Sequence, residues 1–261
     1  MTRRVALGIA VLVLVAAGCA SADDPSVSGA GQRREITVFA ASSLTGAFTQ
    51  IGKDFEAADP GTNVTFNFGP SDGLAGQIES EGVADVFASA SPTWMDALAT
   101  ATGVIDRTDF ARNELVIITP PDDPAAIGSI ADLAEPGVQL VLAAEGVPVG
   151  DYARQVLENA GITKAAAANV VSNEQDDASV VAKIGSGEAD AGIVYVSDVT
   201  ETVAPTVRAV AIPDEVNVIA TYPIAVVEGS RSTDLARAFV HYVSGPEGQA
   251  TLRSFGFLPP A

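Results

Sequence analysis

The sequence has very little cysteine or histidine, with one of each among 261 residues. A structural zinc site uses about four such ligands and a disulfide uses two cysteines, so neither can form within one chain. Cationic side chains are also scarce: 14 lysines and arginines stand against 33 aspartates and glutamates, which gives a formal net charge of −19. Such a surface repels phosphate backbones, which argues against nucleic acid as a partner.

Motifs of common enzymes are missing as well. There is no GxSxG elbow, no Walker A loop and no GxGxxG fingerprint in the sequence. The single histidine, His241, lies in the helical segment LARAFVHYV, where it is expected to be a packed or surface residue rather than a catalytic base. No spacing among the many acids singles out a catalytic pair. The sequence therefore predicts a protein that is not an enzyme.

No apolar run reaches the length of about 20 residues that a membrane-spanning helix needs. The longest run, 5–17, follows two arginines and ends just before Gly18-Cys19, a pattern typical of a secretory signal. The small residues before Cys19 resemble the bacterial lipobox, in which the cysteine is lipidated, although Ala16 stands where that motif more often carries leucine. The alternative is an ordinary cleaved signal with an incidental cysteine.

The N-terminal region is therefore expected to consist of a lipoprotein signal peptide and a tether. The signal peptide covers residues 1–18, and residues 19–34 are rich in serine, glycine, alanine and aspartate, as in flexible linkers. With a lipid on Cys19, the protein would be extracytoplasmic and anchored to the cell membrane.

From Glu35 onward, short apolar strands alternate with helical patterns, which predicts an α/β fold with mainly parallel strands. Ser43 is the expected N-cap of the first helix, and Pro223 predicts that its strand is an edge or crossing strand. Strands are expected at residues 36–40, 63–68, 85–90, 115–119, 139–143, 169–172, 191–196 and 218–227, and helices at 44–55, from about 74, at 92–98, 152–160, 178–184, 233–243 and 246–255.

Two turns share one design, in which a strand ends, small or hydroxyl residues follow, and a helix begins. They are AASSL at 40–44 and GPSDG at 69–73. A helix N-terminus presents unpaired backbone N–H groups and a partial positive charge. Each turn alone is an ordinary helix start. Two of them at the carboxyl ends of neighbouring strands point to a ligand site, because ligands of open α/β sheets bind there.

Four segments, ITVFAASSLTGAF, ADVFASASPTWMDAL, GEADAGIVYVSD and YPIAVVEGS, closely resemble the molybdate-binding proteins of bacterial ABC importers, and the resemblance spans about 36–257. It implies the type II periplasmic-binding-protein fold: two α/β lobes, joined by two crossing strands, with an oxyanion in the cleft. Lobe 1 would be discontinuous, comprising 35–115 plus 222–261, and lobe 2 would comprise 116–221.

The same resemblance implies which residues bind the oxyanion, because the family holds its dianion with hydroxyl and backbone N–H groups. The matching positions are Ser43, Ser71 and Tyr195 for hydroxyl donors, and Val149 and Asp177 for backbone donors. Without the resemblance, Tyr195 could equally be a strand tyrosine buried for packing. Asp72 and Asp177 depart from the family pattern, so either both carboxylates point away from the anion or the ligand is not molybdate.

The implied function is a lipid-anchored, monomeric binding protein that delivers molybdate, and tungstate with it, to an ABC permease. No cofactor and no metal beyond the oxyanion is implied. One alternative is the same architecture with sulfate, phosphate or a small organic acid as ligand. Another is a secreted hydrolase with Ser43 or Ser71 as nucleophile, which lacks a base. A third is a structural or adhesion domain, in which the two helix starts would have no purpose.

Overall fold

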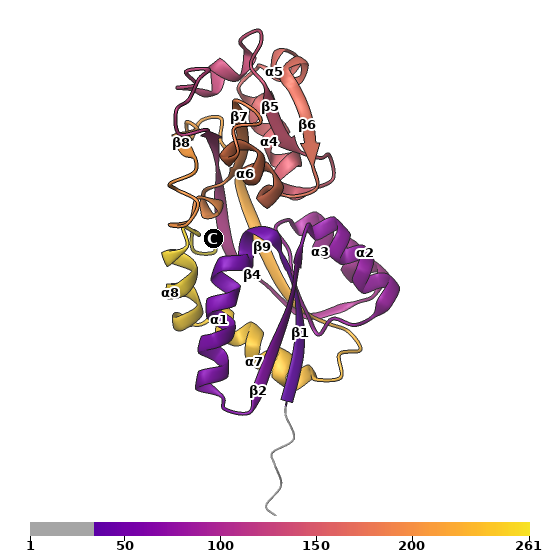
Figure 1. Ribbon diagram of the computed structural model, residues 1–261. Coiled ribbons are helices and arrows are strands. Elements are labelled where there is room, and N and C mark those ends of the chain that lie inside the picture. Colours follow the sequence, from indigo (N-terminus) through magenta and orange to yellow (C-terminus); the bar gives the residue numbers. More distant parts are fainter. Residues whose placement is uncertain (1–33) are drawn as a thin grey trace, which may run out of the picture. The chain divides into compact units, whose positions relative to one another are not determined.

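The computed structural model describes residues 34–261 (Figure 1). The predicted signal peptide, Cys19 and the tether up to residue 33 lie outside the described residues. Arg34, which the sequence predicts as the last residue of the tether, instead opens the first strand, where it pairs with Thr62.

One mixed sheet of nine strands runs through the described residues. Its order is β2-β1-β3-β9-β4-β7-β5-β6, and β8 pairs with β4. The strands are β1 (Arg34–Ala41), β2 (Thr62–Gly69), β3 (Val86–Ala88), β4 (Val104–Thr119), β5 (Leu140–Ala143), β6 (Val170–Glu174), β7 (Ala191–Tyr195), β8 (Arg208–Ala211) and β9 (Ile219–Val227). The pairs β1·β2, β1·β3, β5·β6 and β5·β7 are parallel, as the alternating strand and helix pattern predicts.

Eight α-helices cover the two ends of this sheet (Figure 1). With β1–β3 we group α1 (Thr45–Ala58), α2 (Ser71–Glu81), α3 (Pro92–Ala101), α7 (Thr233–Ser244) and α8 (Pro246–Ser254) as lobe 1. With β5–β8 we group α4 (Pro148–Asn159), α5 (Thr163–Asn169) and α6 (Asp177–Gly185) as lobe 2. Three 3-10 turns, η1 (Ser42–Leu44), η2 (Ile130–Ala134) and η3 (Val196–Asp198), complete the elements.

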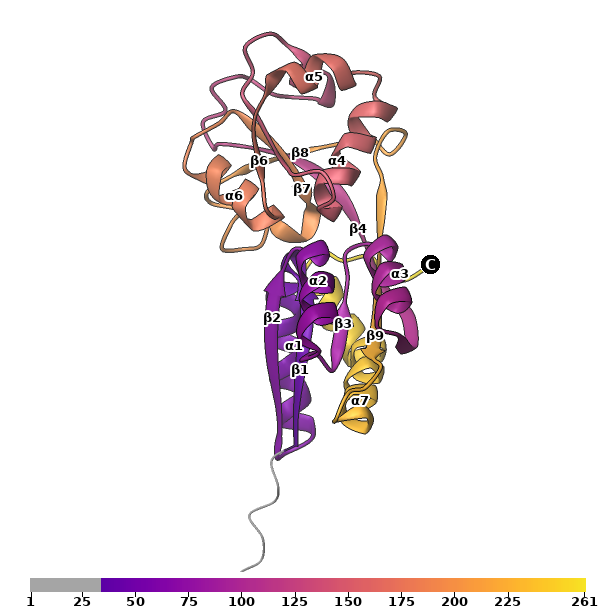
Figure 2. The same ribbon diagram turned by 90° about the vertical axis from the view of Figure 1, so that its right-hand side faces the viewer.

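Strands β4 and β9 run from one lobe into the other, as Figure 2 shows. Residues 104–114 of β4 pair with β9, whereas 115–119 pair with β7 and β8. The lobe boundaries that the sequence predicts, 35–115 with 222–261 and 116–221, stay a prediction, because β4 and β9 belong to both lobes.

One expectation about these strands is wrong, and for another the structure decides between two alternatives. The strand expected at 115–119 is only the buried end of β4, whose earlier part is polar and contains register shifts that break the two-residue alternation. Strand β9 is a crossing strand and not an edge, because it pairs with β3 on one side and β4 on the other. Pro223 lies opposite Asp109, next to one of the irregularities in β4, where a missing N–H is tolerated.

The core of lobe 1 is built around the apolar face of α1. Phe48 lies at its centre, with the rings of Phe66, Phe110 and Phe239 at centroid distances of 5.7–6.2 Å. The spacing of apolar residues in the sequence predicts this face. Packing of this face against the core holds α1 in place, together with the serine turn that precedes the helix. No helix in the part of the chain that the structure describes is both long and apolar enough to cross a membrane.

Candidate functional site

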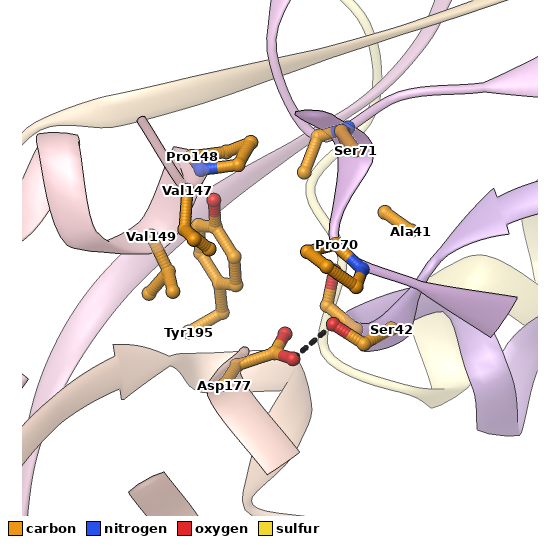
Figure 3. Close-up of a pocket in the computed structure, with 11 residues that line it drawn as sticks. Ala41, Ser42, Pro70, Ser71, Val147, Pro148, Val149, Asp177 and Tyr195 are labelled. Carbon is orange, nitrogen blue, oxygen red and sulfur yellow. Dashed lines mark hydrogen bonds between the residues drawn. The ribbon is translucent and has the colours of Figure 1, made fainter. Parts of the chain in front are cut away.

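The five residues that the sequence predicts as ligand donors line one small cavity between the lobes (Figure 3). Ser43 and Ser71 come from lobe 1, and Val149, Asp177 and Tyr195 come from lobe 2. The rest of the lining consists of Ala41, Ser42, Pro70, Ala90, Val147 and Pro148. The cavity measures about 10 Å³ for the centre of a water-sized sphere, which corresponds to roughly one water molecule.

Three α-helices start at this cavity. Ser71 is the first residue of α2 and Asp177 the first of α6, while Val149 follows the first residue of α4, Pro148. The backbone N–H groups of a first helical turn have no partner within the helix, and they form the positive end of its dipole. Proline has no N–H, so Val149 supplies the first donor of α4. The arrangement suits an anion.

The start of α4 lies very close to the end of β5. A Cβ atom added at Gly150 would stand 2.5 Å from the carbonyl oxygen of Ala143 and 2.2 Å from that of Ala144. Only glycine allows this approach. The contact holds the N–H of Val149 at the edge of the cavity.

The two lobe 1 serines have buried hydroxyl groups with one partner each. The Oγ atom of Ser71, whose residue is 1% exposed, accepts a 3.0 Å hydrogen bond from the backbone N–H of Ala90, which leaves its own proton free to donate. The Oγ atom of Ser43, 8% exposed, lies 3.0 Å from the hydroxyl of Tyr222, and either atom can donate.

The expectation that Ser43 is a helix N-cap is wrong. Ser42–Leu44 form a 3-10 turn, α1 begins at Thr45, and the N-cap residue Leu44 makes no side-chain cap. The side chain of Ser43 turns inward to Tyr222 instead of back to the helix. Ser43 therefore forms a buried hydrogen bond with Tyr222 of β9 in place of a capping bond to the backbone of α1.

Tyr195 ends β7, and its hydroxyl is one of two buried side-chain atoms within residues 34–261 that lack a hydrogen-bond partner. The residue is 1% exposed, and its ring lies 5.7 Å from that of Tyr222. Burial raises the pKa of the Tyr195 phenol well above its usual range, so the phenol keeps its proton and acts as a donor. Leaving a buried donor unpaired costs about 1–3 kcal/mol. An acceptor in the cavity would remove that cost.

Asp177 does not behave as the sequence predicts. Its residue is 3% exposed and lines the cavity, and its carboxylate accepts hydrogen bonds from the Ser42 hydroxyl and from the N–H of Ala178 at 2.9 Å. The side chain thus forms part of the cavity wall rather than pointing away (Figure 3). Asp72 is not among the lining residues, and its Oδ1 atom is the second buried atom without a partner.

Sequence reasoning missed two residues of this site. Ser42 joins lobe 1 to Asp177 of lobe 2, and the tandem serine of AASSL was the only signal for it. Tyr222 contacts Ser43 and also lies 3.5 Å from the Nδ2 atom of Asn113, which donates at 2.8 Å to Ser197. Nothing in YPIAVV distinguishes Tyr222 from a tyrosine buried for packing.

The groups in the cavity that could interact with an anion are hydroxyl and backbone N–H donors, not cationic side chains. No lysine or arginine is among its lining residues. In the region from 34 to 261 there is no group of three or more histidine, cysteine, aspartate or glutamate side chains placed to hold a metal ion. His241 lies exposed on α7, beside Asp106 and Arg237, and is not part of the cavity.

Comparisons with known proteins show the family of the chain. A family model described as bacterial extracellular solute-binding protein matches residues 36–258. The molybdate-binding protein ModA of Mycobacterium tuberculosis H37Rv is 41% identical over 255 residues, which are 96% of this chain and 95% of that protein. ModA of Escherichia coli K12 is 33% identical over 235 residues, 85% of this chain and 88% of that protein.

A solved structure shows the same fold. The Azotobacter vinelandii periplasmic molybdate-binding protein matches with a TM-score of 0.76 over 87% of this chain and 100% of that chain, at 19% identity. The predicted α/β class and periplasmic-binding-protein architecture are confirmed. The chain therefore belongs to the bacterial extracellular solute-binding proteins and, within them, to the ModA family.

Proposed function

We propose that this protein captures molybdate, and tungstate with it, outside the cytoplasmic membrane and delivers it to an ABC permease. Its ModA relatives are binding proteins of transport systems, and it is not an enzyme. The observation that carries the proposal is the buried, unpartnered hydroxyl of Tyr195, which lies in one cavity with the helix starts at Ser71, Val149 and Asp177.

In this proposal, each donor serves an oxygen of the oxyanion. Ser43, Ser71 and Tyr195 donate through their hydroxyl groups, and Val149 and Asp177 donate through their backbone N–H groups. Hydrogen bonds to a charged acceptor contribute about 1.5–3 kcal/mol each, more than those between neutral groups. Pre-aimed donors of this kind are needed here, because a chain of net charge −19 cannot attract a dianion at long range.

Closure of the lobes is the functional step that we propose. Ser43 and Ser71 belong to lobe 1 and the other three donors to lobe 2, so the ion can meet all of them only when the lobes approach. Strands β4 and β9 carry the chain between the lobes, which makes them the natural place for bending near the boundaries 115/116 and 221/222.

The anchor belongs to the same proposal. A lipid on Cys19 and a tether over residues 19–34 would hold a monomeric binding domain close to its permease. The support is the sequence alone: the small residues before Cys19 and the composition of 19–34.

The rival ligands are sulfate, phosphate and small organic acids. A binding site for an amino acid would need an arginine for the carboxylate, and no arginine lines the cavity. A hydrolase using Ser43 or Ser71 would need a base, and the only histidine lies on α7 outside the cavity.

A thermal-shift panel on the domain from residue 20 onward distinguishes these ligands. The panel contains molybdate, tungstate, sulfate, phosphate and common amino acids. Ligand at 100 times its dissociation constant adds about 2.7 kcal/mol to the free energy of unfolding. We expect the largest shifts with molybdate and tungstate. A shift with amino acids alone, or with sulfate or phosphate but not molybdate, would contradict the proposal.

A further inference from the structure

Asp177 lies at the boundary between the small cavity and a second, larger pocket. This second pocket has a volume of about 320 Å³ and lies between α1, α6 and η3, with Asp198, Thr200 and Phe255 in its lining. Three residues line both spaces: Ser42, Ser43 and Asp177. Asp177 therefore lies between the proposed anion position and the second pocket, which has room for water.

Asp177 does not face this boundary alone. Asp198, on η3, lines the second pocket together with Asp177, and its Oδ2 atom accepts the N–H of Tyr195 at 2.9 Å. Burial raises the pKa of Asp177 and, to a greater degree, that of Asp198, and the charge of Asp177 adds to the rise at Asp198. Two buried carboxyl groups that face one pocket disfavour each other's ionisation.

The groups around this carboxyl pair come from five elements, and none is a cation. They are Ser42 of η1, Asp176 and Ala178 of α6, Tyr195 of β7, Asp198 of η3 and Tyr222 of β9. Ser42 and the N–H of Ala178 favour the ionised form of Asp177, while burial and Asp176 oppose it. No lysine or arginine is among the residues that line either space.

An oxyanion in the cavity would place two further negative charges beside Asp177. An ionised carboxylate at that distance would repel the anion strongly, because the surroundings are buried and weakly screening. The repulsion disappears if the carboxyl takes up a proton. A neutral carboxylic acid can also donate its single O–H to an anion oxygen, while its Oδ1 atom continues to accept from the Ser42 hydroxyl and the N–H of Ala178.

We propose that the side chain of Asp177 is a further ligand of the oxyanion, acting as a neutral carboxylic acid, so that each captured dianion enters together with one proton. This inference rests on the proposed function. The proton comes from solvent through the second pocket, is held by the Asp177–Asp198 pair while the anion is bound, and returns to solvent on release. Affinity is then highest at low pH and falls as pH rises.

The test is isothermal titration of the full mature chain with molybdate from about pH 6 to about pH 9, in pairs of buffers with different ionisation enthalpies. Above the pKa of the pair, the dissociation constant of the wild type should rise by up to tenfold per pH unit, with uptake of up to one proton per ion. Asp177→Asn keeps the size and a donor but cannot titrate. Its dissociation constant should change less than about twofold over this range.

Asp176→Asn is the matched control, because it removes the same charge one residue away and asparagine is an equally good N-cap. It should keep the proton uptake, and circular dichroism checks that both variants fold. Binding by the wild type that does not depend on pH, or equal proton uptake by Asp177→Asn, would overturn the inference alone. Absence of molybdate binding at every pH would overturn the proposed function and this inference with it.

Discussion

The indole nitrogen of Trp94 donates a 2.8 Å hydrogen bond to the backbone carbonyl oxygen of Gly146. This bond joins α3 of lobe 1 to the turn before α4 of lobe 2, outside the cavity that we assign to the anion. Trp94 is also the only tryptophan in the chain. Its surroundings therefore depend on whether the lobes are in contact.

We expect molybdate to change the intrinsic fluorescence of Trp94, because closure brings the indole to Gly146. Trp94→Phe keeps an aromatic ring but removes the donor. It should weaken affinity by about 0.5–1.5 kcal/mol, the net value of a neutral hydrogen bond. Titration calorimetry measures the affinity of the variant. An emission spectrum that molybdate leaves unchanged in the wild type, under conditions where calorimetry shows binding, would contradict closure at this contact.

Removal of either serine hydroxyl should weaken the binding of molybdate. Ser43→Ala and Ser71→Ala should each cost about 1.5–3 kcal/mol of binding free energy, the value of a hydrogen bond to a charged group. Ser71→Ala should also lower the melting temperature, because the N–H of Ala90 loses its partner. His241→Ala serves as the control and should leave affinity unchanged. Equal losses at all three positions would mean that the titration reports folding rather than the site.

Asp198 should destabilise the ion-free protein at neutral and higher pH. Its pKa is raised by burial, so the folded form binds its proton more tightly than the unfolded chain does. Stability is therefore lost as pH rises from the usual aspartate range, near 3.8, toward the raised pKa of the folded protein.

Asp198→Asn removes this charge and keeps an oxygen to accept the N–H of Tyr195. The variant should be more stable than the wild type in urea titrations at about pH 8, and the difference should shrink toward about pH 4. Comparing the two proteins at each pH cancels the contribution of the acids that do not interact with Asp198. A constant difference across that range would show that Asp198 is not held with a raised pKa.

Cys19 should anchor the protein to the membrane. Cys19→Ser should release it into the soluble fraction without changing the melting temperature or the molybdate affinity of the domain, because none of the residues that line the cavity lies before β1. Membrane fractionation and mass spectrometry of the N-terminus measure the anchor. A variant that still carries a covalent lipid would refute the role of Cys19.

The sequence was most informative where local pattern decides the structure. The apolar spacing of α1 places Phe48 in the core, and the paired turns at 40–44 and 69–73 mark helix starts at the ends of neighbouring strands. These features depend on residues a few positions apart, so periodicity and turn chemistry reveal them. Together with the resemblance, they placed all five expected donors in one cavity.

The parts that could not be predicted depend on contacts between distant segments. Ser43 turns to Tyr222, 179 residues away, instead of capping its own helix. Asp177 faces Ser42, 135 residues away, instead of pointing outward. Local sequence patterns cannot predict such contacts, because the two partners come together only when the whole chain has folded.

The central claim is that the lobes close on molybdate with the Tyr195 hydroxyl as a donor, and Tyr195→Phe tests it most directly. The substitution keeps the ring that packs at 5.7 Å from Tyr222 and removes only the unpartnered hydroxyl. The melting temperature of the ion-free protein should not fall, because a buried donor without a partner is removed.

The measurement is the dissociation constant and the release rate of molybdate, by calorimetry and stopped-flow fluorescence, for the wild type and Tyr195→Phe. We predict a loss of roughly 1–3 kcal/mol, about tenfold to a hundredfold in affinity, seen mostly as faster release because the bond forms in the closed protein. Affinity and release rate equal to those of the wild type would make Tyr195 a core tyrosine and contradict the site.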